Sequence, residues 1–153
     1  LPSRFIATTP QELQRFAGQV ARRLRAGDLV LLSGPLGAGK TTFAQGVGAA
    51  LGVRERLTSP TFVIAREHRG DLPVVHVDAY RLGGLDELED LDLASELDDA
   101  VTLVEWGHGM AEMLADGYLL VDIDREAASG ETRVVRLSGV GDRWADVVSV
   151  DSQ

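Results

Sequence analysis

Hydrophobic side chains recur every three or four residues near the start of the chain, and this spacing predicts an amphipathic helix. The helix begins at the capping box Thr9-Pro10-Gln11-Glu12, with proline at the first helical position, and Gly27 is expected to end it. Its apolar face comprises Leu13, Phe16, Ala17, Val20, Ala21 and Leu24. This face is expected to pack against a core.

A short continuous apolar run follows from Leu29 to Ser33, as is typical of a strand buried on both sides in a parallel sheet. It leads through a glycine-rich loop into a second predicted helix, 41–51, which Gly52 ends. Further strands are predicted at 62–67, 74–77, 101–104, 118–123 and 132–137, with a helical region near 85–97. The order strand, glycine loop, helix indicates an α/β domain.

The composition is that of an ordinary globular domain. The 153 residues are 44% hydrophobic and 25% charged, and we find no repeat or linker, so residues 1–153 are expected to form one domain with 141–153 as a peripheral tail. The absence of cysteine excludes a disulfide framework or a thiolate metal site. Without a signal peptide or an apolar run near 18 residues, we expect a cytoplasmic protein that does not span a membrane.

The net charge of −9 is unevenly distributed. No lysine or arginine occurs from residue 82 to residue 124, and acidic residues are dense between 86 and 99. Because nucleic-acid binding relies on cations that displace counterions, autonomous RNA or DNA binding is not expected. The acidic run is interpreted as a solvated surface, with a partner-docking face as the alternative.

The loop between the first predicted strand and its helix is a complete G-x-x-x-x-G-K-[ST] motif, from Gly34 to Thr41. Lys40 is the only lysine in the chain, and its ammonium is suited to reach between β- and γ-phosphates. The backbone N–H groups expected to cradle phosphates belong to Gly37, Ala38, Gly39, Lys40 and Thr41. The Thr41 hydroxyl is placed to bind Mg²⁺, and Thr42 to contact the α-phosphate.

A magnesium nucleotide site also needs a carboxylate, usually at the end of a strand beside the loop strand. Two predicted strands end at acids, Asp78 and Glu105. We assign Glu105 to the metal, directly or through water, and Asp78 to the orientation of a metal-bound or attacking water. The alternative for either acid is a strand-end residue that caps the next turn.

The polar residues of two other segments can each be interpreted in two ways. Thr58, Ser59 and Thr61 lie where nucleotide-state sensors occur in many phosphate-loop proteins, although an ordinary Ser/Thr-Pro turn explains them too. Tyr80 and Arg81 are switch or partner candidates, with a surface arginine as the alternative.

The remaining aromatic and polar candidates are less specific. Trp106 packs either by the nucleotide or in the core, His76 is interpreted as a core histidine, and His108 as a loop residue. Thr9 and Arg133 are candidates to border the nucleotide.

The motifs taken together resemble the TsaE (formerly YjeE) family in their order and spacing. They are Gly34 to Thr42, Thr58-Ser59-Pro60-Thr61, His76-Val77-Asp78-Ala79-Tyr80-Arg81-Leu82 and Glu105-Trp106-Gly107, and they cover most of the chain. The resemblance implies a P-loop NTPase-like three-layer α/β sandwich, with a mostly parallel central sheet extended by antiparallel strands. Many members have an acid where this chain has Pro35.

The resemblance also implies an activity. The family comprises small bacterial ATPases of the tRNA threonylcarbamoyladenosine pathway, which modifies an adenosine next to the anticodon. This chain would bind ATP with Mg²⁺ and hydrolyse it, weakly alone and faster with the TsaB and TsaD partners, and would meet tRNA only through that complex. Family members use the residues at Thr41 and Glu105 for the metal and the residue at Asp78 in hydrolysis.

Other phosphate-loop classes fit less well. A small-molecule kinase is the main alternative, but it usually needs a cationic lid, which the stretch from 82 to 124 lacks. A Ras-like GTPase reads guanine with a second lysine, and an ABC-type signature is only echoed late in the chain, at 137–141. A nucleotide-gated binding module, in which turnover resets an assembly, is not separated from a work-producing ATPase by the sequence.

Overall fold

The computed structural model describes residues 1–35, 37–53, 65–68, 72–78, 100–105, 117–125 and 130–148, with the backbone alone described at 65–68 and 78. Seven strands form one sheet in the order β1-β7-β6-β2-β5-β4-β3. The strands are β1 (Arg4–Ala7), β2 (Leu29–Ser33), β3 (Ala65–His68), β4 (Val74–Asp78), β5 (Val101–Glu105), β6 (Tyr118–Arg125) and β7 (Arg133–Val140).

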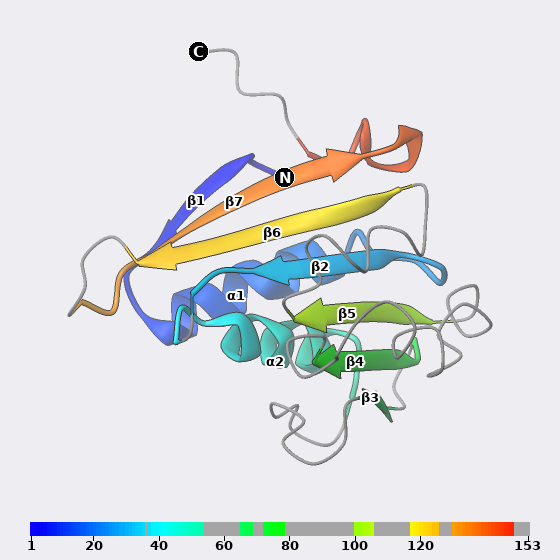
Figure 1. Ribbon diagram of the computed structural model, residues 1–153, viewed down its shortest axis with the longest axis horizontal. Coiled ribbons are helices and arrows are strands. Elements are labelled where there is room, and N and C mark those ends of the chain that lie inside the picture. Colours follow the sequence, from blue (N-terminus) through cyan, green and yellow to red (C-terminus); the bar gives the residue numbers. More distant parts are fainter. Residues whose placement is uncertain are drawn as a thin grey trace.

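The centre of the sheet is parallel and its edges are antiparallel. Strands β6, β2, β5 and β4 run in one direction, while β7 and β3 pair antiparallel to their neighbours and β1 pairs antiparallel to β7. The carboxyl ends of the parallel strands point to the left in Figure 1, where the chain leaves β2 and turns into α2. The expected fold class is confirmed, and ligand sites in such sheets lie at this edge.

Two helices in the described part of the chain, α1 (Pro10–Ala21) and α2 (Lys40–Ala50), pack on each other and on one face of the sheet. Alternate residues of β2 reach this shared core, as Val30 and Leu32 show. Leu29 and Leu31, on the opposite face, are also buried. Burial on both faces is what the continuous apolar run predicts for the middle layer of a sandwich.

The first helix is shorter than its apolar pattern predicts. Thr9 caps it by accepting a hydrogen bond from the Glu12 N–H, and the Glu12 carboxylate accepts hydrogen bonds from the N–H and hydroxyl of Thr8. The helix ends at Ala21, and Leu24 remains buried in the turn that follows. Leu24 therefore keeps the apolar spacing of the helix because it is buried, although it lies outside the helix.

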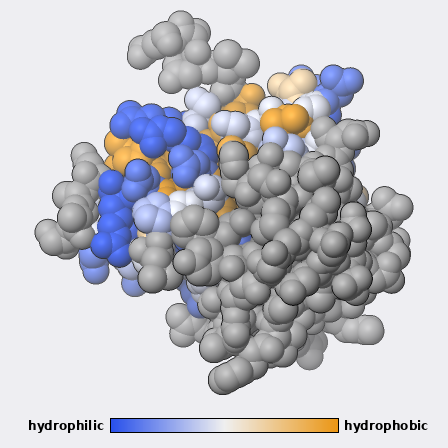
Figure 2. Space-filling view, in the orientation of Figure 1, coloured by the Kyte–Doolittle hydropathy of each residue, from blue (hydrophilic) through white to orange (hydrophobic). Residues whose placement is uncertain are grey.

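The edge strand β1 is absent from the sequence predictions. Its partner β7 lies far along the chain, and four residues without a nearby turn give no local strand signal. Phe5 stacks on Phe16 of α1, with ring centroids 4.2 Å apart, while Ile6 faces solvent. On the part of the described surface that Figure 2 shows, hydrophobic residues lie between hydrophilic ones.

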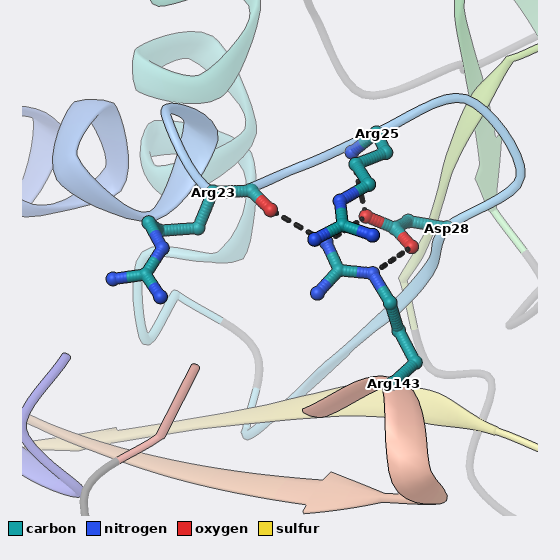
Figure 3. Close-up of polar contacts among 4 residues, drawn as sticks. All are labelled: Arg23, Arg25, Asp28 and Arg143. Atoms are coloured by element: carbon teal, nitrogen blue, oxygen red, sulfur yellow. Dashed lines mark hydrogen bonds and ion pairs between the residues drawn. The ribbon is translucent and has the colours of Figure 1, made fainter. Parts of the chain in front are cut away.

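The segment 141–148 is not a peripheral tail. A short 3₁₀ helix, Asp142–Trp144, buries the Trp144 side chain in the core, and Val147 is buried as well. Arg143 donates two hydrogen bonds to the buried Asp28 carboxylate, at 3.1 and 2.9 Å, and a third to the Arg23 carbonyl (Figure 3). These contacts fasten the segment to the turn before β2. No helix in the described residues is long and apolar enough to cross a membrane.

Candidate functional site

The glycine-rich loop lies between the end of β2 and the start of α2. Gly34 has φ +145°, and a Cβ there would lie 2.1 Å from the carbonyl oxygen of Ile123 on β6. Gly39 has φ +115°, and a Cβ there would meet the Leu13 side chain of α1 at 2.8 Å. Glycine is thus required at both positions, because the backbone approaches its neighbours closely and φ is positive.

The first turn of α2 presents backbone N–H groups at the end of this loop. The N–H groups at the start of a helix have no intrahelical partner, and the N-cap Gly39 has no side chain to satisfy them. The Ala38 N–H, which was expected to join this nest, instead donates to the Pro35 carbonyl at 3.0 Å. The amides of the turn that begins at Gly39 lie at the helix N-terminus, where an anion binds, and contact of the Gly37 amide with a phosphate remains a prediction.

Lys40 lies across the start of the same loop. Its ammonium donates to the carbonyl oxygens of Gly34 and Pro35, at 2.7 and 3.0 Å, and the residue is 6% exposed. The sole lysine of the chain is therefore positioned by the loop itself, beside the helix N-terminus. Positive charge and helix amides converge at one point, which is the electrostatic requirement for binding a phosphate group.

Two arginines from the β6–β7 hairpin hold the outside of the loop. Arg133 donates to the Ala38 carbonyl at 2.8 Å and to the Gly37 carbonyl at 3.4 Å, and Arg125 donates to the Gly37 carbonyl at 3.2 Å. The two arginines are register partners on neighbouring strands. Sequence analysis placed Arg133 near the nucleotide and missed Arg125, because only the strand register brings it to the loop.

Half-buried Thr41 at the start of α2 meets the buried side chains of Glu105 and His76 near the carboxyl ends of β5 and β4. The Thr41 hydroxyl donates to the Glu105 carboxylate, at 3.2 Å from Oε1 and 3.5 Å from Oε2. His76 Nε2 lies 2.5 Å from Glu105 Oε2. His76 is a buried histidine, as the sequence indicates, but its partner is the carboxylate expected to serve the metal.

The two strand-end acids lie side by side in the sheet register. Strand β5, which ends at Glu105, is the direct neighbour of the loop strand β2, while β4, which ends at Asp78, is one strand further away. Asp78 and Glu105 are register partners. Glu105 therefore lies one strand from the loop strand and Asp78 two strands from it, and the separate roles expected for the two acids remain predictions.

The other candidates have different placements. The Thr9 hydroxyl caps α1, whose first turn meets the loop where Leu13 approaches Gly39. Thr42 is half-buried in the first turn of α2. Candidates that lie outside the described residues are Thr58, Ser59, Thr61, Tyr80, Arg81, Trp106 and His108. Contact of Thr9, Thr42 or Arg133 with a nucleotide remains a prediction.

Comparison with known proteins gives a consistent result. The family model "Threonylcarbamoyl adenosine biosynthesis protein TsaE" matches residues 7–135, which include the loop and both strand-end acids. The chain belongs to the TsaE family. TsaE proteins take part in the biosynthesis of threonylcarbamoyladenosine in tRNA, so this chain is assigned to tRNA modification.

Individual relatives match most of this chain. The TsaE protein of Streptomyces coelicolor is 55% identical over 139 residues, which cover 87% of this chain and 94% of the relative. The TsaE protein of Mycobacterium tuberculosis is 45% identical over 144 residues, covering 86% and 85% of the two chains. The crystal structure of Bacillus subtilis YdiB superposes with a TM-score of 0.75 at 34% identity, covering 92% of this chain and 87% of YdiB.

Proposed function

We propose that this TsaE-family chain binds ATP with Mg²⁺ at the loop between β2 and α2 and hydrolyses it as an accessory subunit of tRNA threonylcarbamoyladenosine synthesis. It acts with TsaB and TsaD, and it meets tRNA only through that complex. The observation that carries the proposal is the convergence of Lys40, the α2 amides and the Thr41–Glu105 pair at one edge of the sheet.

The Thr41–Glu105 pair fits a magnesium ion. Adjacent oxygen ligands of an octahedral Mg²⁺, each about 2.1 Å from the metal, lie about 3.0 Å apart. The Thr41 hydroxyl oxygen and Glu105 Oε1 are 3.2 Å apart, so both can become ligands with little movement. The described residues contain no group of three or more His, Cys, Asp or Glu suited to a metal. Such a group is not required for Mg²⁺, because this ion usually takes only one or two ligands from the protein and its remaining oxygens from phosphates and water.

The residues of the site have distinct tasks in the proposed reaction. The α2 amides and the Lys40 ammonium bind phosphate oxygens, and Lys40 balances the charge that develops on the transferred phosphoryl group. Thr41 and Glu105 would hold the magnesium ion, which when bound supplies charge stabilisation to the phosphate oxygens. Asp78, the register partner of Glu105, orients the attacking water.

The two arginines that bind the outside of the loop help to position the phosphates. Arg133 and Arg125 bind carbonyl oxygens, which turns the dipoles of those peptide groups toward the outside of the loop. A loop whose geometry is fixed before the nucleotide binds loses little entropy on binding, which favours affinity. The net charge of −9 agrees with a protein whose RNA contact is made by its partners.

Nucleotide titration tests the site directly. Lys40→Ala is expected to abolish ATP binding or turnover, while the matched control Arg22→Ala removes an exposed cation at the far end of α1 and should leave both unchanged. Glu105→Ala is expected to lose Mg²⁺-dependent hydrolysis. Unchanged ATP affinity in Lys40→Ala would overturn the site, and metal dependence lost in Asp78→Ala alone would mean that the two acids are reversed.

Phosphate release tests the biological role. We expect slow release from the chain alone and a marked increase when TsaB, TsaD and tRNA are added together. The same assay examines the alternative small-molecule kinase. ATP consumption that is stimulated by a phosphorylatable metabolite, with no effect of the partner proteins, would contradict the proposed role.

A further inference from the structure

His76 is the polar residue of this site for which the proposed reaction has no task. It lies on β4 and is fully buried, although its ring carries two polar nitrogen atoms. Nε2 contacts Glu105 Oε2, while Nδ1 has no hydrogen-bond partner among the described residues. Among the described residues, the only polar contact of the ring is therefore with the Glu105 carboxylate, which lies beside Thr41.

The sheet register explains how the two side chains meet. His76 pairs with Leu103 on β5, and Glu105 is two residues further along the same strand, so both side chains project from the face that carries α2. Neighbouring strands are about 4.8 Å apart and residues two positions apart share a face, so the two long side chains are within reach of each other. The contact is built into the pairing of β4 with β5 and does not depend on a loop.

The contact restricts the Glu105 carboxylate. The last torsion of a glutamate side chain is soft, so burial alone does not fix the plane of the two oxygens. Here Oε2 lies 2.5 Å from His76 Nε2, and Oε1 lies 3.2 Å from the Thr41 hydroxyl. A carboxylate that binds a metal is ionised and only accepts hydrogen bonds, so the proposed magnesium role of Glu105 requires His76 to donate through Nε2–H. His76 thus holds Oε2, while the Thr41 hydroxyl lies nearer Oε1, at 3.2 Å, than Oε2, at 3.5 Å.

We propose that His76 is a positioning residue that fixes the Glu105 carboxylate in the orientation needed to bind Mg²⁺ together with Thr41. The inference rests on the proposed magnesium role of Glu105. Hydrogen-bond partners of metal ligands orient those ligands, and their removal typically lowers metal affinity about 10–100-fold. His76 touches neither nucleotide nor metal in this account, and its effect is transmitted through Glu105 alone.

Two substitutions separate orientation from simple core filling. His76→Leu fills the buried position with an apolar side chain that has no donor, whereas His76→Gln has an amide nitrogen near the position of Nε2. The probe is Mn²⁺ in place of Mg²⁺, titrated into the protein with bound ADP and followed by electron paramagnetic resonance. We expect His76→Leu to weaken Mn²⁺ binding about tenfold and His76→Gln to restore it to within about threefold of wild type.

Metal-free nucleotide affinity and a double mutant complete the test. ADP affinity measured in EDTA should change less than about twofold in His76→Leu, because the donor acts on the metal ligand and not on the phosphate loop. In a Glu105→Gln background, His76→Leu should have no further effect on Mn²⁺ binding. Equal losses with and without metal, or an additive loss in the double mutant, would overturn the positioning role.

A measurement on the wild-type protein covers the case in which His76→Leu does not fold. The chain has three histidines, so long-range ¹H–¹⁵N spectra can resolve each imidazole. We expect His76 to be protonated at Nε2 and its ¹⁵Nε2 signal to shift in Glu105→Gln. Protonation at Nδ1 alone would overturn the inference. Failure of wild-type protein to bind Mn²⁺ in the presence of ADP would instead overturn the proposed function, so the two failures are distinguishable.

Discussion

Replacement of Gly46 by alanine sets two opposite effects against each other. Gly46 lies inside α2, where alanine is favoured over glycine by about 1 kcal/mol because glycine loses more backbone entropy. A Cβ at this position, however, would lie 2.6 Å from the Gln14 carbonyl oxygen and 2.8 Å from the Ala17 Cβ of α1. Ordinary contact begins near 3.4 Å, so the two helices must move apart.

The packing effect should exceed the propensity effect. The atoms that the new methyl group meets belong to the α1 backbone and to a Cβ, and neither can rotate away. Overpacking of a close-packed interior typically costs about 1–3 kcal/mol, and this contact is at the severe end. We expect Gly46→Ala to lower the free energy of unfolding by about 1–2 kcal/mol, with Tm falling by about 2–4 °C for each kcal/mol.

Gly18→Ala is the matched control on the partner helix. A Cβ there would lie 3.7 Å from the Ala50 Cβ, which is an ordinary contact, so alanine should stabilise the protein by about 0.5–1 kcal/mol. Urea unfolding followed by circular dichroism measures both variants, with the m-value as the check on two-state behaviour. Equal stabilisation by the two substitutions would refute the close approach of α1 and α2.

Three further predictions follow from other contacts. Arg143→Gln should lower the free energy of unfolding in urea by about 1.5–3 kcal/mol, because it leaves the buried Asp28 carboxylate with fewer donors; a loss below about 0.5 kcal/mol would contradict this. Arg133→Leu should weaken ATP binding about tenfold in a calorimetric titration, since the loop carbonyls lose their brace, and unchanged affinity would argue against that role. Hydrogen bonds from the Thr8 side chain and then its N–H lower the pKa of Glu12 below the ordinary value of 4.5. A lowered pKa stabilises the fold above the unfolded-state value, so the stability difference between wild type and Glu12→Gln should be present at neutral pH and vanish as pH falls below 4.5; a constant difference would disprove it.

Local patterns in the sequence predicted the parallel centre of the sheet. The apolar run from Leu29 to Ser33, the phosphate loop and the helix after it are contiguous, so their signals are strong and their bounds nearly correct. The strand ends at Asp78 and Glu105 were placed for the same reason. Both acids also lie at one edge, because neighbouring parallel strands end together.

The elements that sequence reasoning missed depend on distant pairings. Strand β1 is fixed by pairing with β7, and Arg125 reaches the loop only because β6 and β7 form a hairpin that ends there. Trp144 is buried next to Arg143, whose ion pair with Asp28 joins two positions far apart in the chain. The contact between His76 and Glu105 requires the exact register of β4 with β5, which no spacing within one strand reveals.

The most direct test of the central claim is phosphate release from ATP by the purified chain, measured with TsaB, TsaD and tRNA present. We predict turnover that requires Mg²⁺, is lost in Lys40→Ala and is strongly reduced in Glu105→Ala, in parallel with the formation of threonylcarbamoyladenosine in the tRNA. Modified tRNA formed at the wild-type rate by Lys40→Ala, with no phosphate released, would contradict the account.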